Sequence, residues 1–167
     1  MKLIVLTGAS GSGKTTLARA TGARLGGQIE VRFFDSIGVP PAEQRIAEYG
    51  SDGGWQRTKT VEWMQRIAPI VQSGRNLLFE GQTRFSFLNE AIAAANIVGC
   101  RLILVDCDDA TRTHRLVLER RQPELANSTM LSWARFLRGE AERGGHEILD
   151  TSASSLHMCI ERICRHF

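Results

Sequence analysis

The sequence predicts an α/β domain in which helices cover both faces of a doubly wound, parallel β-sheet. Short apolar runs of strand length alternate with segments of helical periodicity along the chain, and this alternation is typical of that fold class. Most of the apolar runs are continuous, as in strands buried on both faces. A glycine-rich loop separates the first apolar run from the first helical segment, and such sheets bind ligands at their strand ends.

Size and charge favour one domain spanning residues 1–167 and a small-molecule partner. The chain is 43% apolar, which is enough to bury a core. Its formal net charge of +3 is too small to indicate a nucleic-acid partner. A monomer is the default for a chain of this size, so we expect a monomer or weak dimer.

The sequence also indicates a cytoplasmic protein. The amino-terminal apolar run is too short for a signal peptide, and no stretch of about 18 apolar residues predicts a membrane span. The four cysteines form no C-x-x-C pair, which favours free thiols in a reducing compartment over a structural metal site.

The first expected strand, Lys2–Thr7, leads into Gly8–Thr16, which carries the phosphate-loop pattern G-x-x-x-x-G-K-[ST]. Its glycines allow backbone N–H groups to approach phosphate oxygens. Lys14 can reach the β and γ phosphates, the Thr15 hydroxyl suits Mg²⁺, and the helix beginning near Lys14 adds its dipole. The residues expected to contact the nucleotide here are Gly8, Ala9, Ser10, Gly11, Ser12, Gly13, Lys14, Thr15 and Thr16.

Apolar periodicity and glycine or proline breaks predict the other elements. The first helix ends at Gly26-Gly27, and the run Ile29–Phe33 alternates with polar residues as an edge strand does. Two helices with a flexible joint at Gly50–Gly54 occupy residues 42–74. The remaining expected elements are a strand at Asn76–Glu80, a helix at Phe87–Val98, a strand at Arg101–Cys107, a helix from Asp108 or Asp109 to about Arg121, a loop at Gln122–Asn127, a helix at Met130–Arg143, a strand at His146–Leu149 and a helix at Ser154–Arg165.

Polar residues follow several of these strands. Because the carboxyl ends of parallel strands meet at one edge of a sheet, we expect these residues in one cleft with the glycine-rich loop. They are Asp35, Glu80, Arg84, Asp106, Asp150 and Thr151.

The loop motif and the order of the elements resemble the small P-loop kinases, a group that contains the adenylate, shikimate and gluconate kinases and the polynucleotide 5′-kinases. The resemblance spans nearly the whole chain, although only the phosphate loop is highly specific. It implies a three-layer P-loop NTPase fold with five strands in the order 2-3-1-4-5. It also implies ATP and Mg²⁺ as cofactors, an acceptor-binding segment at residues 38–74 and a short lid at residues 120–130.

Two residues are candidate ligands of the acceptor. The segment Phe33–Ser36 resembles the end of the second strand in shikimate kinases, which implies that Asp35 contacts the acceptor hydroxyl and acts as a catalytic base. As an alternative, Asp35 only opens the turn before Gly38. Trp55 is expected either to stack on a ring of the substrate or to be a hydrophobic anchor.

Two further strand ends match this group. The segment Glu80–Arg84 is similar to the D-G-x-x-R stretch of nucleoside monophosphate kinases, with glutamate in place of aspartate. The similarity implies that Glu80 lies beside Mg²⁺ and that Arg84 binds a phosphate or carboxylate of the acceptor; an ordinary solvated arginine is the alternative. Asp150 and Thr151 resemble the segment that passes the adenine ring.

Arg112, Arg115, Arg120 and Arg121 precede the loop at Pro123, where these kinases carry lid arginines. Such arginines stabilise charge on the transferred phosphoryl group. The family spacing R-x-x-x-R is absent, because Arg115 and Arg120 are five residues apart. We expect one or two of the four to act, with Arg115 and Arg120 as the catalytic candidates; a solvated basic helix face is the alternative.

Together these residues favour an ATP- and Mg²⁺-dependent kinase with a small-molecule acceptor, and Asp35 favours a hydroxyl over a phosphate as the accepting group. A nucleotide-binding NTPase or switch protein is an alternative, although 167 residues leave little room for the extra elements such proteins use. A 5′-end kinase of a nucleic acid is a weaker alternative, which predicts affinity that falls steeply with salt.

Overall fold

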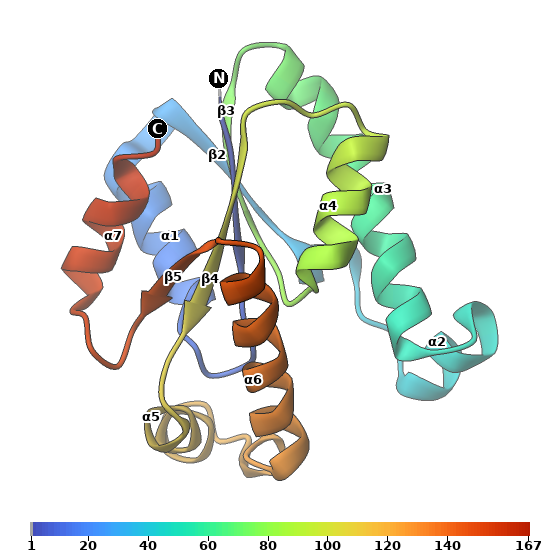
Figure 1. The fold of residues 1–167 in the computed structure, drawn as a ribbon, viewed down its shortest axis with the longest axis vertical. Helices are drawn as coiled ribbons and strands as arrows, with labels where there is room; N and C mark the ends of the chain where they lie inside the picture. The colour runs from blue at the N-terminus through green and yellow to red at the C-terminus, as the bar shows by residue number, and fades with distance from the viewer. Residues whose placement is uncertain (1) are drawn as a thin grey trace.

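The computed structural model describes residues 2–167 and contains five parallel strands between two layers of helices (Figure 1). The strands are β1 (Leu3–Thr7), β2 (Ile29–Phe33), β3 (Asn76–Glu80), β4 (Cys100–Asp106) and β5 (Glu147–Asp150). They lie in the order β2-β3-β1-β4-β5, which confirms the predicted strand order and fold class. The first strand is therefore central, and the strand with alternating polarity is at an edge, as expected.

The helices form the two outer layers. They are α1 (Lys14–Leu25), α2 (Ala42–Tyr49), α3 (Asp52–Gln72), α4 (Phe85–Ala94), α5 (Asp109–His114), α6 (Ser128–Arg143) and α7 (Leu156–Cys164). In Figure 1, α1 and α7 lie on one side of the sheet, whereas α3, α4 and α6 lie on the other. The sheet is consequently buried on both faces: Leu3 belongs to the core beneath α3 and Ile4 to the core beneath α1.

The strand register brings the predicted polar residues to one edge of the sheet. Glu80 pairs in register with Leu6 of β1 and with Phe33 of β2. Asp106 pairs with Asp150 at the ends of β4 and β5. These carboxyl ends surround the loop that follows β1, as the fold class predicts.

Several predicted boundaries differ from the structure. The helix expected at Phe87–Val98 is α4, which begins two residues earlier and stops before Asn96, whose φ is 51°. The expected flexible joint is short, because the Ser51 hydroxyl accepts a hydrogen bond from the N–H of Gly54 at 2.9 Å and thereby caps α3. The expected loop 122–127 contains a 3₁₀ turn at Pro123–Leu125.

Trp55 belongs to the core rather than to an open substrate surface. It is 7% exposed, and its ring meets that of Phe34 edge-on, with the centroids 5.7 Å apart. The helical continuation of α3 through Gly53 and Gly54 carries the side chain inward. This packing favours the alternative in which Trp55 is a hydrophobic anchor. Stacking on a substrate ring would require an exposed ring face, and the Trp55 side chain is buried.

The cysteines are free thiols, as predicted from their spacing. Cys107 and Cys159 are buried, and burial raises the pKa of the Cys100 thiol to about 12. The Cys100 thiol is therefore protonated and unreactive near neutral pH. Over residues 2–167, the helices are too short or too polar for any of them to traverse a lipid bilayer.

Candidate phosphate-binding site

The glycine-rich loop between β1 and α1 lies against the end of β4. A Cβ atom on Gly8 would lie only 2.2 Å from the carbonyl oxygen of Val105. Gly11 and Gly13 have φ values of 79° and 91°, in the left-handed region that glycine adopts without strain. The loop therefore depends on glycine for a close approach and for a tight turn, as a phosphate cradle does.

Replacement of Gly8 by alanine should destabilise the protein by about 2–4 kcal/mol, because the new methyl group collides with backbone rather than with a movable side chain. Thermal unfolding measures the loss. Gly27→Ala is the matched control, since a Cβ there meets no atom within 4 Å. Equal melting temperatures for the two variants would contradict the close approach at Gly8.

Lys14 and Glu80 form the charged centre of the site. The Nζ atom of Lys14 lies 3.8 Å from Oε1 of Glu80, and both side chains are buried. Burial lowers the pKa of Lys14, an effect that Glu80 and Asp35 oppose. Burial likewise raises the pKa of Glu80, whereas Lys14 and a hydrogen bond from Thr15 lower it. Two ionisable side chains thus share one water-poor location, and the exposed Thr15 supplies a hydroxyl at its edge.

This group of side chains fits a magnesium-nucleotide. A carboxylate and a hydroxyl oxygen are ligands that Mg²⁺ accepts, and Thr15 and Glu80 supply them side by side. Lys14 supplies a point charge suited to phosphate oxygens. Glu80 has the position at the end of a buried strand that the sequence predicts for a magnesium-side acid.

Asp35 lies near this centre, in the 3₁₀ turn Phe34–Ile37 that follows β2. Its charge acts on both Lys14 and Glu80, so the three groups face a common region. Its side chain is exposed, whereas Phe34 is buried beside it. The carbonyl oxygen of Asp35 also accepts a hydrogen bond from the N–H of Gly38 at 3.0 Å. Asp35 therefore occupies a turn, and its exposed carboxylate lies near enough to act on Lys14 and Glu80.

Thr151 and Arg115 join the exit of β5 to the phosphate loop. Arg115 donates to the Thr151 hydroxyl at 2.8 Å and to the Thr151 carbonyl oxygen at 3.1 Å. The same hydroxyl donates to the carbonyl oxygen of Ser12 at 2.8 Å. Asp150 accepts from the N–H of Ser152 at 2.9 Å and shapes the turn. The predicted adenine-side segment is thus fixed against the loop, and Arg115 is already engaged in holding it there.

A π turn at Arg115–Glu119 replaces the end of the single helix predicted up to Arg121. The N–H of Arg120 donates to the carbonyl oxygen of Arg115 at 2.9 Å, which closes an i to i−5 turn. The π turn holds one residue more than an α-helical turn. Residues five apart, such as Arg115 and Arg120, can therefore lie one turn apart, and both line the same cavity. Arg120 is exposed, and its charge contributes to lowering the pKa of Lys14.

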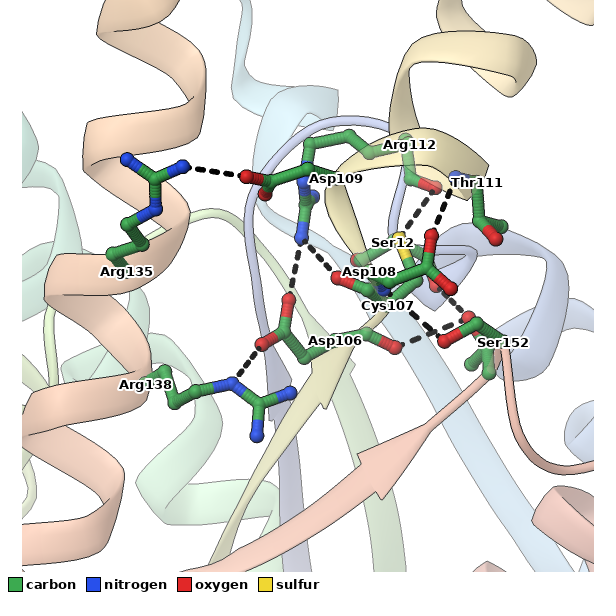
Figure 2. A network of polar contacts seen from close by, with 12 residues as sticks. Ser12, Asp106, Cys107, Asp108, Asp109, Thr111, Arg112, Arg135, Arg138 and Ser152 are labelled. Atoms are coloured by element: carbon green, nitrogen blue, oxygen red, sulfur yellow. Dashed lines mark hydrogen bonds and ion pairs between the residues drawn. The ribbon is translucent and has the colours of Figure 1, made fainter.

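Arg112 is not a lid arginine, because it is 0% exposed. Figure 2 shows it bound to Asp106, whose second oxygen accepts from Arg138 of α6. Arg138 was not predicted from the sequence, and its spacing gave no signal, since only the packing of α6 brings it to β4. Asp106 is consequently paired with two arginines. The prediction that Asp106 lines the open cleft is therefore wrong. Arg121 is exposed, with φ of 53°.

Arg84 is partly enclosed by aromatic rings. Its guanidinium carbon lies 5.1–5.4 Å from the ring centroids of Phe87, Trp133 and Phe136. Within residues 2–167, no carboxylate lies within 4.0 Å of the Arg84 guanidinium. Arg84 is therefore a cation held by ring faces rather than a freely solvated arginine.

A cavity of about 580 Å³ lies beside the loop. Its lining includes Gly13, Lys14, Arg120, Thr151 and Leu156. This volume is within the range of small-molecule sites, roughly 300–1,000 Å³. It extends from Lys14 and the loop to the turn at Thr151.

Comparison with protein-family models and with curated proteins found no match. The fold, by contrast, is shared with many solved structures. A sugar kinase from Janibacter sp. HTCC2649 has a TM-score of 0.67 at 18% identity, with coverage of 99% of this chain and 93% of that one. A gluconokinase from Sinorhizobium meliloti 1021 has a TM-score of 0.64 at 18% identity, and the match covers 99% of this chain and 90% of that one.

A shikimate kinase from Acinetobacter baumannii, solved with shikimate, has a TM-score of 0.62 at 16% identity, and the match covers 99% of this chain and 92% of that one. At these identities the comparison establishes the fold alone. The chain has the architecture of the small P-loop kinases over nearly its whole length.

Proposed function

We propose that this chain is an ATP- and Mg²⁺-dependent kinase that transfers the γ-phosphoryl group to a hydroxyl of a small molecule. The observation that carries the proposal is the buried pair of Lys14 and Glu80 at the phosphate loop, beside the exposed Thr15, with the charges of Asp35 and Arg120 acting on Lys14. Phosphoryl transfer depends chiefly on alignment and charge stabilisation, and these groups can supply both. Structures with the same fold bear the names of sugar, gluconate and shikimate kinases, which supports this class.

On the donor side, the loop N–H groups and Lys14 bind the triphosphate, and the turn at Asp150 and Thr151 borders the base. Thr15 and Glu80 hold Mg²⁺, which neutralises phosphate charge when it is bound. Arg120 is exposed beside Lys14 and stabilises charge that develops on the transferred group. Arg115 keeps the base-side turn against the loop through Thr151.

On the acceptor side, Asp35 accepts the proton of the attacking hydroxyl. Residues 38–74, which follow Asp35 in the chain, form the acceptor-binding segment. Arg84 is the candidate partner for an anionic group on the acceptor, because its guanidinium has no carboxylate partner within residues 2–167.

Asp35→Asn should lower kcat by roughly 10²-fold with a hydroxyl acceptor and leave ATP affinity unchanged. The substitution removes the proton-accepting carboxylate while it preserves side-chain shape. Ser36→Ala is the control for a role in the turn alone, since the Ser36 hydroxyl donates to the carbonyl oxygen of Phe33 at 2.7 Å. Similar losses in both variants would assign Asp35 to the turn and remove it as a base.

A panel of acceptors tests the reaction itself. Labelled phosphate from ATP is offered to sugars, nucleosides, nucleotides, amino-sugar antibiotics and 5′-hydroxyl oligonucleotides, with and without Mg²⁺. We expect Mg²⁺-dependent label in a small molecule that carries a hydroxyl. Release of phosphate without any labelled acceptor would instead support an NTPase, and label only in oligonucleotides, with steep salt dependence, would support a 5′-end kinase.

A phosphate acceptor is the second candidate, and Arg84 favours it. Its guanidinium carries donors suited to two phosphate oxygens at once. In that case nucleotides in the panel become labelled, and Asp35→Asn barely changes their rate.

A further inference from the structure

Arg112 reaches the phosphate loop from α5 although it cannot meet a ligand. It is 0% exposed and is among the largest fully buried side chains of residues 2–167. Its guanidinium donates to the carbonyl oxygen of Ser10 at 2.8 Å and to that of Cys107 at 3.3 Å. Its aliphatic stem packs against Gly11, where a Cβ would lie 3.1 Å from Cγ of Arg112. One side chain thus contacts two consecutive residues of the loop.

Asp106 holds the Arg112 guanidinium in place. Its Oδ1 atom accepts from Arg112 at 2.5 Å, and its Oδ2 atom accepts from Nε of Arg138 at 2.8 Å (Figure 2). A buried guanidinium would be costly without a charged partner, and the buried carboxylate provides it. The arginines come from α5 and α6, so a single carboxylate at the end of β4 joins both helices to the loop.

The contact with Ser10 also orients the loop. Because the peptide group is planar and trans, a carbonyl that points toward Arg112 turns the N–H of Gly11 in the opposite direction. The carbonyl oxygens of Gly11 and Ser12 face Arg115 in a similar way, each at 3.4 Å from its Nη1 atom. Arginine side chains therefore occupy the carbonyl side of the loop, and the N–H side is left for an anion.

We propose that Arg112, fixed by Asp106 and Arg138, is a positioning residue that keeps the phosphate loop in its anion-binding shape before the nucleotide arrives. This inference rests on the proposed nucleotide-binding function. A loop that adopts the competent shape only part of the time binds more weakly in proportion to the lost population. If release from Arg112 reduces that population to one tenth, the Kd for Mg-ATP rises about tenfold.

The first variant separates position from charge. Arg112→Lys keeps a positive charge near the loop but cannot donate in three directions from one planar group. We expect the Kd for Mg-ATP, measured by calorimetry, to rise about tenfold. An unchanged Kd would overturn the proposal, because the charge of Arg112 alone would then suffice.

The second variant separates position from stability. Arg112→Met leaves Asp106 short of one partner and is expected to lower the melting temperature. The double variant Asp106→Asn/Arg112→Met removes the unpaired charge, so the melting temperature should recover while the Kd remains about tenfold weaker. If the melting temperature and the Kd for Mg-ATP both returned to the wild-type values, the network would serve stability alone and the proposal would be overturned.

Hydrogen exchange gives a readout on the loop itself. Without nucleotide, the amides of residues 9–13 should exchange faster in Arg112→Lys than in the wild type, and Mg-ATP should restore their protection. Arg135→Gln is the matched control, because this α6 arginine pairs with Asp109 at 2.6 Å and does not contact the loop. Exchange rates equal to those of the wild type in both variants would contradict loop positioning.

Arg138→Gln provides a test that does not depend on the buried substitutions. The Arg138 side chain is 39% exposed, so the variant should fold, and it still releases one side of Asp106. We expect a Kd raised about threefold and faster exchange in the loop; no change in either would overturn the role of Arg138. A wild-type chain that binds no Mg-ATP would instead refute the proposed function, so the two failures are distinguishable.

Discussion

Lys14→Ala is expected to lower the rate of phosphoryl transfer roughly 10³-fold. Lys14 is buried 3.8 Å from Glu80 at the start of α1, and burial lowers the pKa of its ammonium group. Glu80 and Asp35 oppose that shift. Charges interact more strongly there than in water, so removal of the ammonium group should cost both nucleotide affinity and transition-state stabilisation.

Initial rates with labelled ATP, at saturating acceptor, measure this loss. Lys2→Ala is the control, because Lys2 is exposed and immediately precedes β1, at the end of the strand opposite the loop. Its activity should equal that of the wild type. If Lys14→Ala kept its rate within about threefold, or if both variants lost activity equally, the role of Lys14 at the phosphates would be refuted.

Arg120→Ala should have the second large effect, a loss of about 10³-fold in kcat with only a small change in ATP affinity. Arg120 is exposed and acts electrostatically on Lys14, whereas Arg115 is hydrogen-bonded to Thr151. An arginine that is free to move can contact the phosphoryl group when charge develops on it. Such an interaction forms mainly in the transition state, and its loss therefore lowers kcat.

Arg121→Ala is a closely matched control, since it removes the same charge from the next position of the chain. Arg121 has a φ of 53°, so the backbone changes direction at this residue, after the π turn. The kinetics of both variants are measured with the acceptor found in the labelling panel. Equal losses of kcat would indicate a general basic surface and would contradict a specific role for Arg120.

Much of the fold could be predicted because its signals are local. Each buried strand is a short apolar run, and the glycine-rich motif between β1 and α1 fixes where the sheet binds ligands. The strand ends then bring Glu80 and Asp35 near Lys14. The strand order followed from the resemblance to small P-loop kinases, and the structure confirms it.

The parts that were not predicted depend on packing between distant segments. Periodicity cannot reveal the π turn, since the sequence shows only that Arg115 and Arg120 are five residues apart. It also cannot indicate that Arg112 points inward, because burial of that guanidinium requires Asp106 and Arg138, from β4 and α6. The four arginines that look equivalent in sequence thus divide into the buried Arg112, Arg115 bound to Thr151, and the exposed Arg120 and Arg121.

Titration of Mg-ATP into the purified chain by isothermal calorimetry tests the central claim most directly. Binding at one site per chain, with a Kd below about 1 mM and with weaker affinity after Mg²⁺ is removed, is the predicted result. Absence of binding at ATP concentrations of several millimolar, in protein shown to be folded, would contradict the account.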